Sequence, residues 1–138
     1  MIGLVLVAHN GVAGEMLKAA EHVLGPLPQV SVLDVSPGNA TDQLRIMLQE
    51  RVKECESGHG VLILVDIFGG TPSNVSLGCL KPGSCEVLAG FNLPMLIKAA
   101  SLRAETDDLL ALAHEVAAAG RQHIYLASET PLVKMEGS

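Results

Sequence analysis

Apolar and polar positions along this chain follow two patterns, and the first is a set of short, mainly apolar runs, two of which are unbroken. Runs of this kind, rich in Val, Leu and Ile, are typical of strands that are covered on both faces of a parallel sheet. Residues 2–8 and 60–65 are such runs. Residues 30–35 and 86–89 are mainly apolar but include Ser31, Asp34 and Glu86, and a shorter apolar run occupies 124–126. We therefore predict four strands, of which the first and third are covered on both faces, and a short final strand.

The segments between these runs place apolar residues three and four positions apart, which is the spacing of amphipathic helices. This spacing predicts helices over 12–24, 40–56, a short stretch from 72, about 93–102, and 109–119. Thr71 is a good N-cap for the short helix, and Gly120 is expected to end the last one. Strands that alternate with helices indicate a single α/β domain, a doubly wound and mainly parallel sheet with helices on both faces.

The predicted strand at 124–126 has only three residues, so at the edge of a sheet it would gain little stability alone. Bridging two subunits would be a better place for it, and we therefore expect a homodimer. The following residues, 128–138, are expected to form a mobile tail.

Composition narrows the class of protein. The chain has 138 residues, enough for one domain, and aromatic residues make up only 2%, so its core must be aliphatic. The net charge of −6 offers no basic patch for nucleic acid. No apolar run approaches the roughly 20 residues of a membrane span, and the first residues lack a signal-peptide pattern. Cys55, Cys79 and Cys85 lack the CxxC spacing of a metal or redox site. We expect a cytoplasmic protein with reduced thiols, no metal and no cofactor.

Two of the apolar runs end at an ionisable residue, His9 after the first and Asp66 after the third. The carboxyl ends of neighbouring parallel strands form the crevice where ligands bind. If these strands are neighbours, Asp66 can accept a hydrogen bond from one ring nitrogen of His9 and leave the other nitrogen as a nucleophile. The alternative is that Asp66 only caps the following loop or helix. The other histidines lie in helices or beside turns and are expected to be structural: His22, His59, His114 and His123.

The segment after Asp66 could receive an anion. Gly69 and Gly70 allow close approach of the backbone with free N–H groups, and Thr71 adds a hydroxyl where phosphate oxygens are favoured. The same residues would also form an ordinary turn and cap. The loops after the first, third and fourth strands contain no Lys or Arg, and the chain lacks the GxxxxGK[ST], GxSxG and HExxH patterns. These absences argue against a permanent nucleotide pocket, a hydrolase and a metal site.

Apolar residues gather by sequence at the loop ends of this edge. They are either core residues or, if exposed, a rim suited to docking a protein partner. The residues are Phe68, Phe91, Leu93 and Met95.

Together these strings resemble an enzyme IIA domain of the mannose family of the bacterial phosphoenolpyruvate-dependent sugar phosphotransferase system. The resemblance rests on the first strand ending in His9, on residues 65–74, which contain Asp-x-x-Gly-Gly-Thr-Pro, and on residues 90–96, Gly-Phe-Asn-Leu-Pro-Met-Leu. It covers roughly residues 1–127, which we take as the domain. It implies a mainly parallel sheet with adjacent first and third strands, and a dimer that exchanges its carboxyl-terminal strand.

The resemblance also implies a phosphocarrier. Its histidine, here His9, would accept a phosphoryl group from the phosphocarrier protein HPr and pass it to an enzyme IIB domain, with Asp66 beside the ring and Thr71 near the phosphoryl oxygens. Contact with the membrane would be indirect, through the transporter components. The chain departs from the pattern at Asn10, where many members have glycine, and at Phe68, where tryptophan is more familiar. The sequence contains no IIB domain, so the expected acceptor is a separate chain.

Three alternatives stay open at this point. The chain could be the related phosphotransfer subunit that serves dihydroxyacetone kinase, which uses an equivalent histidine and another acceptor. It could be a regulatory module in which phosphorylation of His9 reports sugar supply. It could also be a small-ligand-binding α/β domain with no covalent step. The identity of the sugar is out of reach of the sequence, because a IIA domain does not touch it.

Overall fold

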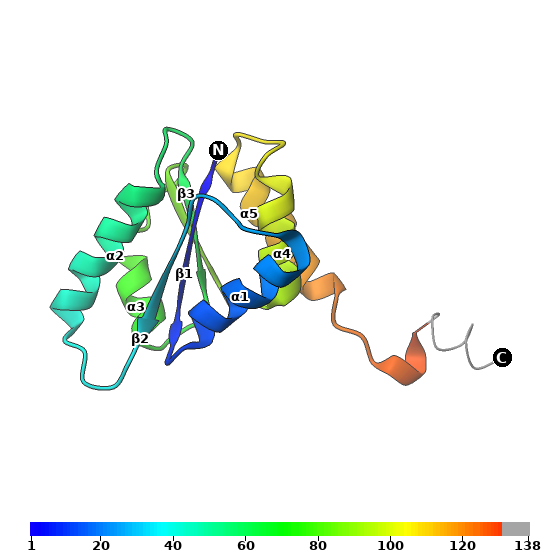
Figure 1. Ribbon diagram of the computed structural model, residues 1–138, viewed down its shortest axis with the longest axis horizontal. Coiled ribbons are helices and arrows are strands. Elements are labelled where there is room, and N and C mark those ends of the chain that lie inside the picture. The colour runs from blue at the N-terminus through cyan, green and yellow to red at the C-terminus, as the bar shows by residue number, and fades with distance from the viewer. Residues whose placement is uncertain (131–138) are drawn as a thin grey trace.

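The computed structural model describes residues 1–130, and a parallel four-stranded sheet lies at the centre of this part of the chain (Figure 1). The strands are β1 (Gly3–His9), β2 (Val30–Val35), β3 (Val61–Val65) and β4 (Cys85–Ala89). They lie in the order β2-β1-β3-β4, so the predicted adjacency of the first and third strands is confirmed. The chain reverses its direction of winding between β1 and β3. Their carboxyl ends therefore border the crevice that such folds use for ligands.

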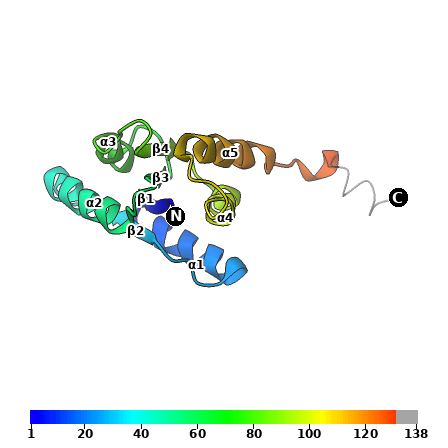
Figure 2. The same cartoon turned by 90° about the horizontal axis from the view of Figure 1, so that it is seen from above.

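Helices cover both faces of the sheet, as predicted (Figure 2). The helices α1 (Val12–Leu24), α4 (Leu93–Leu102) and α5 (Leu109–Gln122) lie on one face. The helices α2 (Thr41–Cys55) and α3 (Thr71–Leu77) lie on the other. Among residues 1–130, none of the helices combines the length and the apolar character that crossing a membrane requires.

The two central strands are buried on both faces, which explains their unbroken apolar sequences. In β1, Leu4 and Leu6 pack toward α1, α4 and α5, whereas Val5 and Val7 pack toward α2 and α3. Every residue of β3 is buried. These two clusters form the core, and they hold the ends of β1 and β3 at a fixed separation.

The last helix differs from its predicted extent. Gly120 does not end α5, which continues to Gln122. Gly120 lies against α4 instead, where a Cβ would come within 2.6 Å of Cγ of Met95. The glycine therefore serves close helix packing rather than termination.

The predicted final strand is wrong for the single chain. Residues 124–126 form no strand pairing, and a 3-10 helix, Ala127–Glu129, follows them. The side chains of Ile124, Tyr125 and Leu126 are 76%, 66% and 63% exposed. Strand structure requires a neighbour to supply the ladder of hydrogen bonds, and residues 1–130 of one chain supply none for this segment. The predicted mobile tail falls mostly on residues 131–138, which lie outside the described part of the chain.

Candidate functional site

The candidate site lies where β1 and β3 end. Val7 pairs with Val65 in the parallel ladder, so the chain leaves the sheet at His9 and Asp66 on adjacent strands. Because the core fixes both strand ends, the side chains of His9 and Asp66 are held close to each other. This is the juxtaposition predicted from the two apolar runs.

One carboxylate oxygen of Asp66 serves both the backbone and the ring of His9. Oδ2 accepts from the main-chain N–H of His9 at 3.0 Å and lies 3.0 Å from Nδ1 of the ring. Oδ1 accepts from the N–H of Ile67 at 2.9 Å. A carboxylate only accepts, so Nδ1 must carry the hydrogen, and in the neutral ring Nε2 keeps its lone pair.

The electrostatic state of Asp66 follows from the same contacts. Burial by itself would raise the pKa of this carboxyl group. The hydrogen bonds from His9 and Ile67 outweigh burial and hold the pKa of Asp66 below its ordinary value of 3.8. The carboxylate is therefore ionised near neutral pH and stabilises positive charge on the imidazole.

Nε2 of His9 faces a glycine. A Cβ built on Gly70 would lie 3.2 Å from Nε2 and 3.0 Å from Cε1 of the ring, closer than ordinary van der Waals contact. Gly69 adopts φ +97, a conformation that other residues rarely take. Of the two glycines predicted to allow close backbone approach, Gly70 thus lies against the nitrogen that Asp66 leaves free, whereas a Cβ on Gly69 would meet nothing within 4 Å.

A groove of about 240 Å³ opens beside His9. It is lined by His9, Asn10, Thr71 and the loop of residues 35–39. None of these lining residues is Lys or Arg. The His9 side chain is 44% exposed and the Asp66 side chain 16%, so the ring is reachable while its orienting carboxylate is shielded. The groove can admit a small anionic group without a fixed cation.

Thr71 lines this groove, but it does not cap the helix as predicted. Gly70 is the N-cap of α3, Thr71 is its first residue, and no side chain caps this end. Pro72 follows Thr71 in the first turn, where proline is favoured. The Thr71 hydroxyl makes no capping bond.

The predicted docking residues separate into two groups. Phe68 is 71% exposed in the loop that follows Asp66, next to exposed Ile67. Phe91 and Met95 are buried in the core between the sheet and α4, which contradicts their assignment to an exposed rim. Leu93 is half-buried and packs against the same core. Phe68 is therefore the predicted rim residue that faces solvent most fully.

The sequence analysis noted Asn10 only as a departure from the family pattern, and it did not single out Asp34. Asn10 adopts φ 47, the left-handed conformation that asparagine tolerates better than most residues, and its N–H donates to the Val35 carbonyl. Asp34 binds the first turn of α1. The Asn residue type was itself a usable signal for positive φ. Nothing local marked Asp34.

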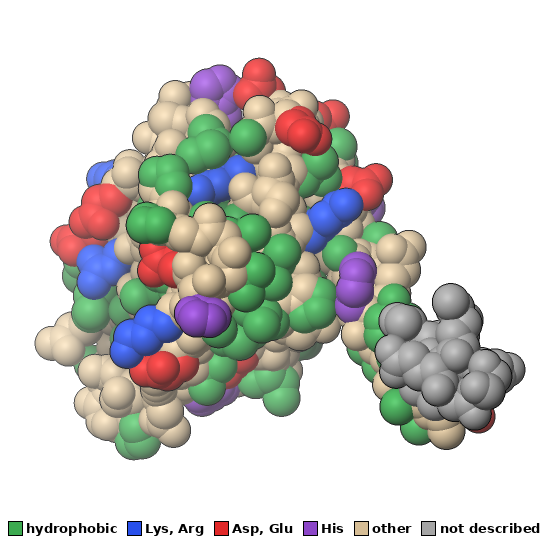
Figure 3. Space-filling model, turned by 45° about the vertical axis from the view of Figure 1, so that its right-hand side comes forward, with side chains coloured by type: hydrophobic (Ala, Val, Ile, Leu, Met, Phe, Trp, Pro, Cys, Tyr) green, Lys and Arg blue, Asp and Glu red, His purple; other side chains and the backbone are tan. Residues whose placement is uncertain are grey.

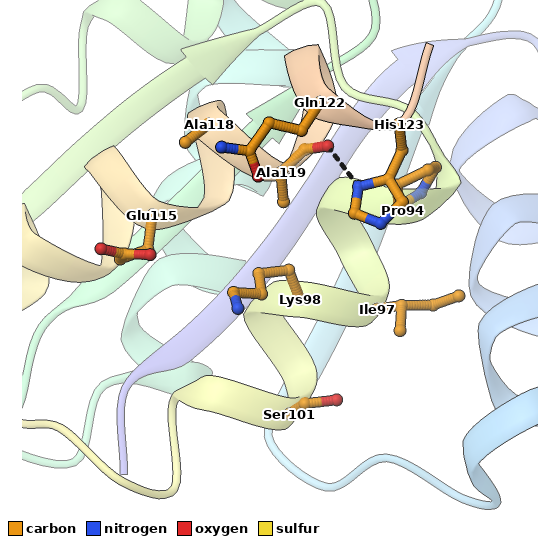
Figure 4. Close-up of a pocket in the computed structure, with 9 residues that line it drawn as sticks. All are labelled: Pro94, Ile97, Lys98, Ser101, Glu115, Ala118, Ala119, Gln122 and His123. Atoms are coloured by element: carbon orange, nitrogen blue, oxygen red, sulfur yellow. Dashed lines mark hydrogen bonds between the residues drawn. The ribbon is translucent and has the colours of Figure 1, made fainter. Parts of the chain in front are cut away.

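A second hollow lies apart from this edge, between α4 and α5 (Figure 4). Its volume is about 420 Å³, and its lining includes Ile97 and Ala118, with Lys98 and Glu115 on its two sides. His123 lies at one end, where its Nδ1 is 2.8 Å from the Ala119 carbonyl. None of the predicted site residues lines this hollow.

The fold and the site together define a class, an α/β domain with a His–Asp pair at the switch point of a parallel sheet. The chain belongs to the PTS system fructose IIA component family, which it matches over residues 3–117, and is a mannose-type enzyme IIA domain of the phosphotransferase system.

Individual relatives agree with this family. The chain is 33% identical over 137 residues to the PTS system mannose-specific EIIAB component of Escherichia coli (strain K12), covering 96% of this chain and 42% of that protein. The chain thus spans less than half the length of that relative. It is 28% identical over 130 residues to the PTS system fructose-specific EIIA component of Bacillus subtilis (strain 168), covering 94% and 88%.

Solved structures share the fold. The phosphotransferase system component EIIA from Streptococcus agalactiae superposes with a TM-score of 0.86 at 28% identity, covering 94% of this chain and 100% of that one. The mannose/sorbose specific IIA subunit from Enterococcus faecalis gives a TM-score of 0.80 at 26% identity, covering 90% and 92%.

Proposed function

We propose that this protein is a cytoplasmic phosphocarrier whose His9 accepts a phosphoryl group from HPr and passes it to an enzyme IIB component for sugar uptake. The observation that carries the proposal is the contact between Nδ1 of His9 and Asp66 together with the free Nε2 beside Gly70. Residues 1–127 form the phosphocarrier domain.

The proposed chemistry is a transfer between two nitrogens. The lone pair on Nε2 of His9 attacks the phosphorus atom carried by the donor histidine, so a new N–P bond forms as the old N–P bond breaks. The bonding electron pair returns to the donor ring. During transfer the His9 ring gains positive charge, which the ionised Asp66 stabilises through Nδ1–H. Transfer to the IIB acceptor repeats the exchange in the other direction.

The surroundings of Nε2 suit a group that must also leave. Backbone at Gly69 and Gly70 and the hydroxyl of Thr71 would contact the phosphoryl oxygens. No Lys or Arg lines the groove, so the phosphoryl group is held less tightly than an arginine clamp would hold it. Weaker holding of the bound group favours onward transfer, because only interactions that strengthen in the transition state speed the reaction.

The partners are proteins that dock over this edge. Exposed Phe68 and Ile67 offer apolar contact area in the loop that follows Asp66. On the face seen in Figure 3, Lys and Arg side chains are scattered among acidic ones rather than gathered into a patch. The exposed residues 124–126 would be covered in a homodimer, where a second subunit supplies the strand pairing that one chain lacks.

The test uses purified enzyme I, HPr and labelled phosphoenolpyruvate. The protein should take up one phosphoryl group that is labile in acid and stable in base, as a phosphoramidate is and a phosphoserine or phosphothreonine is not. His9→Gln should abolish the label while His22, His59, His114 and His123 remain available. Undiminished acid-labile label on folded His9→Gln protein would refute the proposal.

The acceptor separates this proposal from its nearest alternative. Labelled protein should lose its phosphoryl group to a IIB component of the mannose type. Loss only to a dihydroxyacetone kinase subunit would reassign the protein to that pathway, and retention of the label against both would favour a regulatory role.

A further inference from the structure

Asp34 occupies a position that the proposed chemistry does not use. It lies in β2, where its register partner in β1 is Ala8, the residue before His9. Its carboxylate bridges two amides of the next helix: Oδ1 accepts from the N–H of Ala13 at 2.9 Å, and Oδ2 accepts from the N–H of Gly14 at 3.1 Å. The side chain of a strand residue therefore caps a helix that starts from the neighbouring strand.

The helix has no other side-chain cap. The N-cap residue of α1 is Gly11, which has no side chain to accept from the first-turn amides. A Cβ on Gly14 would lie 3.2 Å from Oδ2 of Asp34, so the absence of a side chain there leaves room for the carboxylate. Glycine inside a helix is ordinarily unfavourable, and its presence at this position fits the close approach of Asp34.

The bonds from Asp34 act on the turn that carries His9. Only Asn10 and Gly11 separate His9 from α1, and Asn10 holds a left-handed backbone. The N–H of Asn10 donates to the Val35 carbonyl at 2.9 Å, and the N–H of His9 donates to Asp66. The turn is thus anchored to β3 on one side, by Asp66, and to β2 on the other, by Val35 and Asp34.

Asp34 also decides which amides remain for an anion. The first turn of a helix has N–H groups without internal partners and a positive end of the helix dipole, both of which attract anions. In α1 the carboxylate of Asp34 already binds the amides of Ala13 and Gly14. The start of α1 therefore attracts a phosphoryl group on His9 less strongly, and the phosphoryl oxygens are left to the backbone beside Gly70.

We propose that Asp34 is a positioning residue for His9. It fixes the turn that sets the imidazole against Asp66, and it neutralises the start of α1 so that the phosphoryl group resides on the Gly70 side. The second part rests on the proposed phosphocarrier function. The first part concerns the unphosphorylated protein and stands apart from it.

The test compares Asp34→Asn and Asp34→Ala with matched substitutions at another helix cap. Asp108 is the N-cap of α5 and accepts from the N–H of Ala111 at 3.0 Å, so Asp108→Asn and Asp108→Ala remove the same kind of bond away from His9. The Asn variant at position 34 retains one acceptor oxygen, so it provides a folded protein for the test if the Ala variant unfolds.

The first measurement is nitrogen NMR of the His9 ring in the unphosphorylated protein. The Asp34 variants should shift the ring away from the Nδ1–H form that the contact with Asp66 specifies, and the Asp108 variants should leave the ring signals unchanged. Unchanged ring signals in both Asp34 variants would overturn the positioning role. This result holds whether or not HPr donates to the protein, so it is separable from a failure of the proposed function.

The second measurement is the rate of phosphoryl transfer from HPr at a temperature where all four variants are folded. We expect the Asp34 variants to lose about tenfold, since each loses a hydrogen bond to a charged group at the turn, and the Asp108 variants to stay within about twofold of the wild type. Equal rates for the two sets of variants would mean that Asp34 is only a helix cap.

Discussion

At the scale of single residues, one oxygen atom of Asp66 makes two hydrogen bonds to His9. Oδ2 binds the main chain of His9 and its ring at the same time, each at 3.0 Å, so the backbone position and the side-chain orientation of His9 share one anchor. Such sharing leaves little room for the ring to turn. It also makes the carboxylate a single point at which the proposed site can be weakened without disturbing the apolar core.

Replacing Asp66 with Asn should slow phosphoryl transfer by about 100-fold while the fold persists. The amide has the same shape as the carboxylate, but it carries no charge to stabilise the imidazolium and no longer specifies the Nδ1–H tautomer. Rapid-quench assays of phosphoryl transfer from HPr measure the rate, and circular dichroism checks the fold. A wild-type rate in Asp66→Asn would reduce Asp66 to the capping role that its sequence position also allowed.

The lowered pKa of Asp66 makes a separate prediction about stability. A carboxyl whose pKa is depressed in the folded protein contributes stability above its ordinary value of 3.8, and that contribution is lost as pH falls through the lower, folded value. The stability advantage of the wild type over Asp66→Asn should therefore be full near pH 7 and should shrink in strong acid. Urea unfolding at pH 7 and below pH 3 measures it, and a constant difference would contradict the assignment.

The free side of the ring is tested by Gly70→Ala. The added Cβ would press on Nε2 and Cε1 at 3.2 and 3.0 Å, so labelling should fall by about 100-fold as the reacting atom is displaced or covered. Gly11→Ala is the matched control, because a Cβ there meets nothing within 4 Å. Equal labelling of both variants would show that the phosphoryl group does not occupy the space in front of Gly70.

At the scale of elements, Arg103 ties three segments together at the edge opposite to the site. It follows α4 and is 2% exposed, and burial lowers the pKa of its guanidinium. Nη1 donates to the carbonyls of Ile2 at 3.2 Å and Gln29 at 3.0 Å, and Nη2 donates to the carbonyl of Pro28. The end of α4 is thereby joined to the starts of β1 and β2.

Arg103→Met should lower the free energy of unfolding by about 3 kcal/mol, because the methionine fills the space but cannot donate to the buried carbonyl of Ile2 or to the carbonyls of Pro28 and Gln29. Arg45→Met is the control: Arg45 forms an exposed pair with Asp42 at 3.2 Å, and its loss should cost at most about 1 kcal/mol. Urea denaturation measures both. Similar values for the two variants would mean that Arg103 contributes no more than a surface residue.

Strands and helices could be predicted where neighbouring residues in the sequence carry the pattern, and contacts between distant residues could not. Unbroken apolar runs marked β1 and β3 correctly, because strands buried on both faces have no polar face to show. Phe91 and Met95 were ambiguous, because an apolar residue at the end of a loop can either enter the core or face a partner, and its type does not tell which. The bond from Asp34 to α1 joins residues about 20 positions apart, and no local pattern announces such a contact.

At the scale of the whole molecule, the carboxyl-terminal segment is the part least explained by one chain. Figure 1 shows it leaving the body beyond α5, and Ile124, Tyr125 and Leu126 are mostly exposed on it. Three large apolar side chains in a row are costly to leave in water. The sequence correctly singled out the segment as apolar, but its pairing depends on a neighbour that no single-chain argument supplies.

We expect light scattering at micromolar concentration to give twice the 14.4 kDa mass of the chain. The double substitution Tyr125→Asp and Leu126→Asp should give the single mass, because charge at these positions opposes burial in an interface. Ile46→Asp is the control, since Ile46 is also exposed, at 57%, but lies on α2. A single mass for the wild type would contradict the proposed dimer.

The hydrogen bond from the main chain of His9 to Asp66 spans 57 positions of sequence and joins two central strands. It can form only after β1 and β3 have paired, and the contact of the same Oδ2 with the His9 ring opposes its opening by rotation of the Asp66 side chain. In hydrogen–deuterium exchange the His9 amide should therefore exchange with the slowest, globally unfolding class of amides rather than with the surrounding loops. A newly made chain would become competent for transfer only on completing its central sheet, so incompletely folded copies would not withdraw phosphoryl groups from the pathway.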